Sequence, residues 1–167
     1  NKINKLGYPR IIFSCVVLSF GLYLSSGLFG NNINGWIESY LPPEKQENWL
    51  ENLEDAYNIS ILENKPIFID FTGYTCTNCR WMELNVFELT EVETLFKDFV
   101  LVKLYTDGKE NIHSQNRKLE IDRFGTAALP YYVILSPDDK LIATFPGMDT
   151  KPENFINFLK QAKNKHD

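Results

Sequence analysis

The most informative segment of the sequence is KPIFIDFTGYTCTNCR, residues 65–80. Its first part, Ile67–Phe71, is a continuous apolar run that contains one acid, Asp70. Such a run is typical of a strand that is buried on both faces of a sheet. Residues 72–75 predict a turn, and a helix is expected to begin at Cys76. The sequence therefore predicts a pair of cysteines at the start of a helix that directly follows a buried strand.

Strand and helix signals alternate through residues 41–167, which form the predicted globular domain. Strands are predicted at 67–71, 99–105, 131–135 and 141–145, and helices at 53–64, from 76 past 82, from 90, at 114–124 and at 150–162. The last two strands flank a turn and predict an antiparallel hairpin. This order describes an α/β fold in which a mixed sheet lies between helices.

Cys76 and Cys79 form a CxxC motif. At the start of a helix, unpaired backbone N–H groups and the helix dipole stabilise a thiolate, which lowers the pKa of the first cysteine from about 8.5 to about 3.5–7.5. We therefore expect Cys76 to be the exposed nucleophile that attacks a partner's disulfide, and Cys79 to be the shielded thiol that resolves the mixed disulfide. The alternatives are half of a metal site and a purely structural bridge. Three cysteines, two histidines and no second CxxC disfavour a zinc site.

Asp70 is the only charged residue in its apolar run. A lone buried carboxylate is costly unless it is used or paired, and burial raises its pKa. Placed beneath the CxxC motif, Asp70 is predicted to carry the proton to or from Cys79 during exchange. The alternative is an edge-strand aspartate that faces water. Lys103 also interrupts an apolar strand, and we expect it either to pair with Asp70 or to extend to solvent.

Leu129-Pro130 directly precedes the predicted strand 131–135. A proline just before a strand is typical of a tight turn. The bond before it is open to either isomer, although most X–Pro bonds in folded proteins are trans.

The residues named so far resemble the thioredoxin superfamily. The resemblance rests on strand 67–71, on the motif Cys76–Arg80 and on Leu129-Pro130 before a hairpin, and it covers residues 52–162. Within the superfamily, the segment FTGYTCTNCRWME at 71–83 is most similar to the C-terminal domain of the DsbD family of transmembrane thiol:disulfide interchange proteins. The resemblance implies a thioredoxin-like fold and a protein-disulfide reductase.

The same resemblance implies roles for individual residues. It assigns the nucleophile to Cys76, the resolving thiol to Cys79, the buried acid to Asp70, a cis-proline contact with the partner to Leu129 and Pro130, and a substrate-facing aromatic to Tyr74. The chain departs from the pattern at Thr75, where thioredoxins usually have tryptophan, and at Thr77-Asn78, which replaces Gly-Pro. The two-thiol chemistry carries over, whereas the reduction potential and the choice of partner do not.

Residues 1–40 differ from the rest of the chain in charge. They hold three basic residues and one acid, a net charge of +2, whereas the other 127 residues carry −7 of the overall −5. No charged residue occurs from Ile11 to Ile37, so residues 11–30 are predicted to form a transmembrane helix that is followed by a linker. A buried soluble helix and a cleaved signal peptide are the alternatives. Cys15 is interpreted as a small apolar residue of the span.

Basic residues precede the predicted span, and none follows it until Lys45. The positive-inside rule then places the N-terminal end in the cytoplasm and the body of the chain outside it, where disulfides persist. Because the chain begins at Asn1, we expect it to be a piece of a longer protein. With the family resemblance, this predicts a reductase of the bacterial inner membrane whose catalytic domain faces the periplasm.

The expected partners are periplasmic thiol/disulfide proteins, a membrane electron-transfer domain and the lipid bilayer. The expected redox group is the Cys76–Cys79 disulfide, with no metal and no other cofactor. A net charge of −5 disfavours non-specific nucleic-acid binding, which depends on clustered basic residues. Two alternative functions are a thioredoxin dedicated to apocytochrome c maturation and a metal-binding chaperone that uses the CxxC motif.

Overall fold

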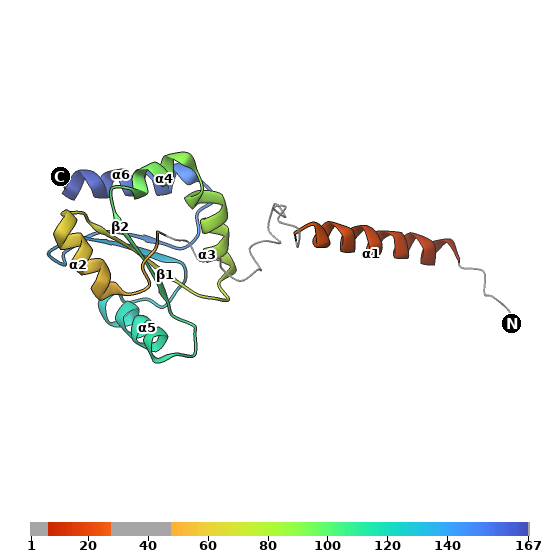
Figure 1. The fold of residues 1–167 in the computed structure, drawn as a ribbon, viewed down its shortest axis with the longest axis horizontal. Coiled ribbons are helices and arrows are strands. Elements are labelled where there is room, and N and C mark those ends of the chain that lie inside the picture. The colour runs from red at the N-terminus through yellow and green to blue at the C-terminus, as the bar shows by residue number, and fades with distance from the viewer. Residues whose placement is uncertain (1–6, 28–47, 167) are drawn as a thin grey trace. The chain divides into compact units, whose positions relative to one another are not determined.

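The computed structural model describes residues 7–27 and 48–166 (Figure 1). The chain divides into two units, residues 1–38 and 39–167, and each is described by itself. The end of the predicted span, at 28–30, and the predicted linker lie outside the described residues.

The first unit contains the helix α1, Tyr8–Gly27. Its apolar side chains, such as those of Phe13 and Leu22, are exposed, and Cys15 is a free thiol. In the described parts of the chain, no helix combines the length and the apolar character that crossing a membrane requires. The transmembrane helix expected from the sequence is therefore not confirmed.

The second unit is built on a four-stranded mixed sheet. Its strands are β1 (Ile67–Thr72), β2 (Val100–Tyr105), β3 (Tyr131–Leu135) and β4 (Leu141–Pro146). They lie in the order β2-β1-β3-β4, with β1 parallel to β2 and antiparallel to β3, and with β3 and β4 paired as a hairpin. All four strands predicted from the sequence are confirmed, with ends that differ by one residue or none.

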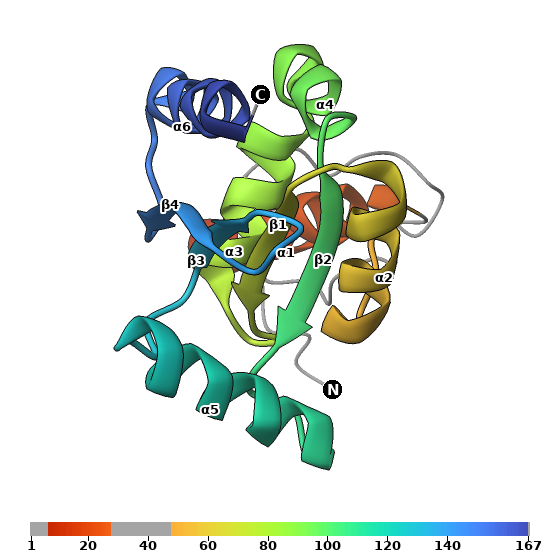
Figure 2. The same ribbon diagram turned by 90° about the vertical axis from the view of Figure 1, so that its left-hand side faces the viewer.

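Helices cover both faces of this sheet (Figure 2). They are α2 (Leu53–Glu63), α3 (Thr77–Met82), the π-helical segment η2 (Glu83–Phe87), α4 (Thr90–Phe96), α5 (Asn111–Phe124) and α6 (Pro152–His166). The sheet separates two hydrophobic cores. In one of them, alternate strand residues such as Phe68 pack against α3, η2, α4 and α6. In the other core, the intervening strand residues, such as Ile69, pack against α2 and α5. Both faces of β1 are therefore buried, which explains why its sequence is apolar except for Asp70 and Thr72.

Local capping explains several helix boundaries. The side chain of Asn52 accepts a hydrogen bond from the Glu54 N–H at 2.8 Å and starts α2, and Gly125 ends α5 in the left-handed conformation. Helix α5 begins at Asn111, three residues before the predicted start. The helix expected from position 76 begins at Thr77, with Cys76 as its N-cap, and continues past Met82 as η2.

Candidate active site

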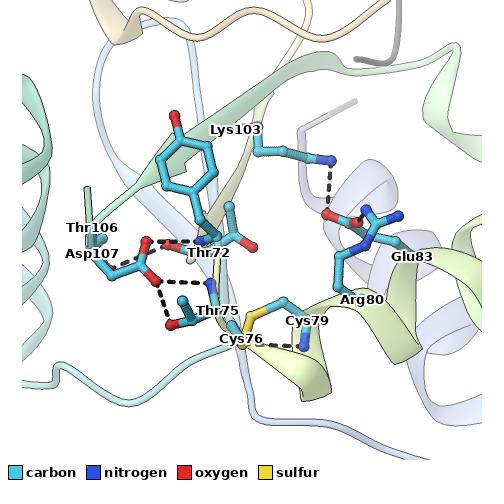
Figure 3. The surroundings of a disulfide bond; sticks show 10 residues. Thr72, Thr75, Cys76, Cys79, Arg80, Glu83, Lys103, Thr106 and Asp107 are labelled. Atoms are coloured by element: carbon cyan, nitrogen blue, oxygen red, sulfur yellow. Dashed lines mark hydrogen bonds and ion pairs between the residues drawn. A yellow bond between two sulfur atoms is a disulfide. The ribbon is translucent and has the colours of Figure 1, made fainter. Parts of the chain in front are cut away.

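A disulfide bond between Cys76 and Cys79 lies at the carboxyl end of β1, where the chain enters α3 (Figure 3). The two Cα atoms are 5.3 Å apart. Cys79 is buried, with 1% of its surface exposed, whereas Cys76 is half-buried. The first sulfur is therefore the more accessible of the two, in the order that the sequence predicts.

The sulfur of Cys76 lies at the amino end of α3. It accepts a hydrogen bond from the Cys79 N–H at 3.2 Å, and the Cys76 N–H donates to the Gly73 carbonyl at 3.2 Å. Helix starts have unpaired N–H groups and a positive dipole end, which favour negative charge. This is the environment in which a reduced Cys76 would be held as a thiolate.

The loop before Cys76 is fixed by Asp107, a residue that sequence reasoning missed. The carboxylate of Asp107 accepts hydrogen bonds from the Tyr74 N–H at 2.7 Å, the Thr75 N–H at 2.9 Å and the Thr75 hydroxyl at 2.8 Å (Figure 3). Partial burial opposes ionisation of Asp107, but the hydrogen bonds from Thr75 and Tyr74 outweigh it and lower the pKa. A Cβ atom at position 73 would lie 2.8 Å from Asp107 Oδ2, so any residue other than Gly73 would displace this carboxylate.

Two further side chains, which the sequence analysis did not predict, pack against the ring of Tyr74. Its ring stacks on Tyr105 with centroids 4.0 Å apart, and it meets the His113 ring edge-on at 5.5 Å. The Glu110 N–H donates to His113 Nδ1 at 3.3 Å, so a neutral His113 carries its proton on Nε2, 3.4 Å from the Tyr74 hydroxyl. Tyr74 remains 45% exposed. A supported aromatic ring is thus presented two residues before Cys76.

Asp70 lies in the middle of β1 and is 1% exposed. Its directly paired positions are Lys103 on β2 and Tyr132 on β3, so the alternative of an edge-strand aspartate facing water is wrong. Neither carboxylate oxygen has a hydrogen-bond partner among the described residues. Burial raises the pKa of Asp70 to about 8; the charge of Lys103 lowers it and that of Glu83 raises it further.

A buried charge cluster formed by Arg80, Glu83 and Lys103 lies beside Asp70. Lys103 Nζ is 2.8 Å from Glu83 Oε1, and Arg80 Nη1 donates to Glu83 Oε2 (Figure 3). The three side chains are at most 8% exposed. The ion pair that we expected between Lys103 and Asp70 is replaced by one with Glu83, and extension to solvent is wrong. A buried ammonium requires a charged partner, and Glu83 reaches it from η2.

The Leu129–Pro130 peptide bond is cis. The Pro130 carbonyl accepts a hydrogen bond from the Gly147 N–H at 2.8 Å, which ties the start of β3 to the end of β4. A Cβ atom on Gly73 would lie 3.2 Å from Leu129 Cδ1, so Leu129 reaches the loop that leads to Cys76. The structure therefore brings Leu129 close to the disulfide loop from a distant part of the sequence.

A family model described as a thioredoxin-like domain matches residues 53–163. The chain belongs to the thioredoxin-like family. Two solved structures with this fold are a thioredoxin from Thermus thermophilus (TM-score 0.61, 17% identity, 72% of this chain and 91% of that one) and the oxidised C-terminal domain of DsbD from Neisseria meningitidis (TM-score 0.55, 18% identity, 68% and 98%). A DsbH oxidoreductase is also similar (TM-score 0.57, 17% identity, 73% and 92%). No curated protein sequence matches the chain.

The redox group of this thioredoxin-like domain is its Cys76–Cys79 disulfide. Across residues 7–27 and 48–166, no group of three or more His, Cys, Asp or Glu side chains is arranged to hold a metal ion. The chain is thus a thioredoxin-like oxidoreductase with a CxxC disulfide.

Proposed function

We propose that the chain is a protein-disulfide reductase that passes two electrons to a partner by dithiol–disulfide exchange. The observation that carries this proposal is the Cys76–Cys79 disulfide at the start of α3, with the more accessible sulfur on Cys76 and the other one buried. The buried carboxyl group of Asp70 also supports the proposal, because it lies on β1, the strand that leads to Cys76, and has no hydrogen-bond partner among the described residues.

The exchange proceeds in two steps from the reduced chain. The Cys76 thiolate attacks one sulfur of the partner's disulfide, which forms a mixed disulfide and releases the other sulfur as a thiolate. Cys79 then loses its proton to the ionised Asp70 and attacks Cys76 Sγ. This second step restores the Cys76–Cys79 disulfide and releases the reduced partner. The partner gains two electrons, and the cysteine pair loses two.

The protonation state of Asp70 controls the second step. A carboxylic acid cannot accept the proton of Cys79, so only the ionised fraction of Asp70 is competent. Because its pKa is raised to about 8, this fraction increases as the pH rises through that value. Resolution of the mixed disulfide is therefore expected to accelerate between neutral and mildly alkaline pH.

The partner is proposed to bind over Tyr74, Leu129 and Pro130. The exposed ring of Tyr74 and the approach of Leu129 to the same loop support this surface. We propose periplasmic thiol/disulfide proteins as partners and a membrane electron-transfer domain as the source of electrons. The fold shared with a DsbD C-terminal domain and the FTGYTCTNCRWME motif at 71–83 support these assignments.

Attachment to the outer face of a bacterial inner membrane is part of the same proposal. The absence of charge from Ile11 to Ile37 and the basic residues before it support a tether. Fractionation of cells that express the full chain tests it, together with protease access from the periplasmic side. Recovery of the chain without membranes would contradict the tether, and protection of the chain inside spheroplasts would contradict its periplasmic side. Neither result would exclude the disulfide chemistry.

Reduction of insulin disulfides by the full chain, with dithiothreitol as the electron source, tests the enzymatic proposal. The unmodified chain should accelerate the reduction, and Cys76→Ser should abolish the acceleration. Cys15→Ser is the matched control, because Cys15 is a free thiol outside the CxxC motif. Equal activity of Cys76→Ser and the unmodified chain would exclude the proposed chemistry.

A further inference from the structure

Tyr132 has a hydroxyl group that the packing of its ring does not explain. The residue lies on β3, is fully buried, and packs against Phe68 and Phe155 with ring centroids 5.7 and 5.3 Å apart. Phenylalanine could make the same ring contacts without a hydroxyl. The Tyr132 hydroxyl has no hydrogen-bond partner among the described residues, although buried tyrosine hydroxyls usually have one.

The position opposite Tyr132 is Asp70. The two residues are direct partners in the antiparallel β1–β3 ladder, so their side chains leave the same face of the sheet. Cβ atoms of such pairs are about 4.5–5.5 Å apart. The carboxylate oxygens of Asp70 are also buried without a partner in the part of the chain that the structure describes. An unpaired hydroxyl donor and an unpaired carboxylate therefore leave the same face at adjacent positions.

Charged groups from neighbouring elements also act on Asp70. Lys103 comes from β2 and Glu83 from η2. Burial raises the pKa of Tyr105 and of Tyr132, and the negative charge of Asp70 raises both further. The ammonium of Lys103 forms its ion pair with Glu83, which also binds Arg80 from α3. Tyr132 therefore offers Asp70 a neutral hydrogen-bond donor from the side opposite to β2.

We propose that Tyr132 is a positioning residue whose hydroxyl donates a hydrogen bond to the Asp70 carboxylate when Asp70 loses its proton. Ionisation of a buried carboxyl group that has no hydrogen-bond donor carries a large free-energy cost. A hydroxyl at the adjacent position lowers that cost for Asp70. The proposal rests on the role of Asp70 in the proposed function. Tyr132 acts through Asp70 and increases the fraction of Asp70 that can accept the proton of Cys79.

Titration of the Asp70 carboxyl carbon by NMR, in the oxidised full chain labelled with ¹³C-aspartate, tests this proposal. Tyr132→Phe keeps the ring and removes the hydroxyl, so Asp70 should titrate about one pH unit higher. Tyr131→Phe is the matched control, because Tyr131 packs against the other core, and it should leave the titration unchanged. Titration of Asp70 at the same pH in Tyr132→Phe and in the unmodified chain would overturn the proposal.

Two further measurements test the same hydrogen bond: the Cζ resonance of Tyr132 and the pH dependence of activity. In the unmodified chain the Cζ resonance of Tyr132 should follow the titration of Asp70, and in Asp70→Asn it should not change in that range. This measurement does not require Tyr132→Phe to fold, and a constant Cζ resonance would also overturn the proposal. The NMR titrations involve no turnover, so a chain that fails to reduce insulin refutes the proposed function without deciding the role of Tyr132. If the function holds, the pH dependence of Tyr132→Phe activity should shift by the same amount.

Discussion

Asp70 and Lys103 are directly paired positions of the neighbouring parallel strands β1 and β2, yet the ammonium of Lys103 forms its ion pair with Glu83 at 2.8 Å. Asp70 consequently has no hydrogen-bond partner among the described residues and keeps a raised pKa of about 8. Glu83 thus satisfies the buried ammonium that would otherwise hold Asp70 ionised. Lys103 and Glu83 therefore form a structural ion pair, whereas the carboxyl group of Asp70 remains able to exchange a proton.

Asp70→Asn is expected to stabilise the oxidised chain at alkaline pH. In the unfolded chain Asp70 ionises near 3.8, whereas in the folded chain it keeps its proton up to about 8. The folded state binds more protons between these values, so its stability falls as the pH rises through this window. Urea unfolding at pH 9 should show a gain of about 3–5 kcal/mol for Asp70→Asn, and at pH 3 almost none. A variant less stable than the unmodified chain at pH 9 would refute the burial of an unpaired carboxyl.

Glu83→Gln is expected to destabilise the chain strongly. The change leaves the charges of Lys103 and Arg80 buried without their common carboxylate, at a cost of about 3 kcal/mol or more. Urea unfolding measures the effect. Asp122→Asn is the matched control, because it breaks the exposed ion pair with Lys118 and should change the stability by less than about 1 kcal/mol. Equal effects of the two variants would show that the buried cluster contributes no more than a surface pair.

Asp107→Asn is expected to loosen the loop before Cys76. The amide keeps one acceptor oxygen and loses the charge that now receives three hydrogen bonds, so the stability should fall by about 1 kcal/mol. The pKa of Asp107 is lowered, so its contribution is present above the unfolded pKa and is lost as the pH falls through the folded one. The variant and the unmodified chain should therefore converge in acid. A difference that does not become smaller as the pH falls through the acid range would contradict this origin.

Glu120→Gln is expected to stabilise the chain above neutral pH. Both carboxylate oxygens of Glu120 are buried without a partner in the described residues, and burial raises its pKa to about 7, although the charge of Arg117 lowers it. The unfolded chain ionises this group near 4.5, so stability is lost as the pH rises from there to about 7. Thermal unfolding at pH 8 should show a gain of about 2–3 kcal/mol. A gain of the same size at pH 4 would rule out titration of Glu120 as its cause.

The sequence predicts the parts of the site that local signals determine. A mostly apolar strand followed by CxxC predicts a buried Asp70 and a cysteine pair at a helix start, because burial on both faces and a helix start are visible within residues 65–80. The role of Asp107 was not predicted, because it depends on the parallel pairing of β1 with β2. This pairing brings the loops that follow the two strands to one edge of the sheet.

The ion-pair partner of Lys103 was not predicted for a similar reason. Glu83 lies in the π-helical segment η2, and no local pattern in the sequence predicts that the carboxylate reaches β2 from there. The pair Tyr131-Tyr132 is equally ambiguous, because alternation puts one ring in each core and the sequence does not say which ring faces Asp70. Tertiary pairing therefore decides how the charged and hydroxyl groups are distributed around the disulfide.

Mass spectrometry of Cys79→Ser, after incubation of the reduced chain with a disulfide substrate, tests whether Cys76 is the nucleophile. The Cys76 thiolate should attack the substrate, and the mixed disulfide should persist because no second thiol is left to resolve it. We expect one covalent adduct that maps to Cys76, that dithiothreitol releases, and that is absent from Cys76→Ser. An adduct at Cys15 alone, or no adduct while the unmodified chain reduces the substrate, would contradict the account.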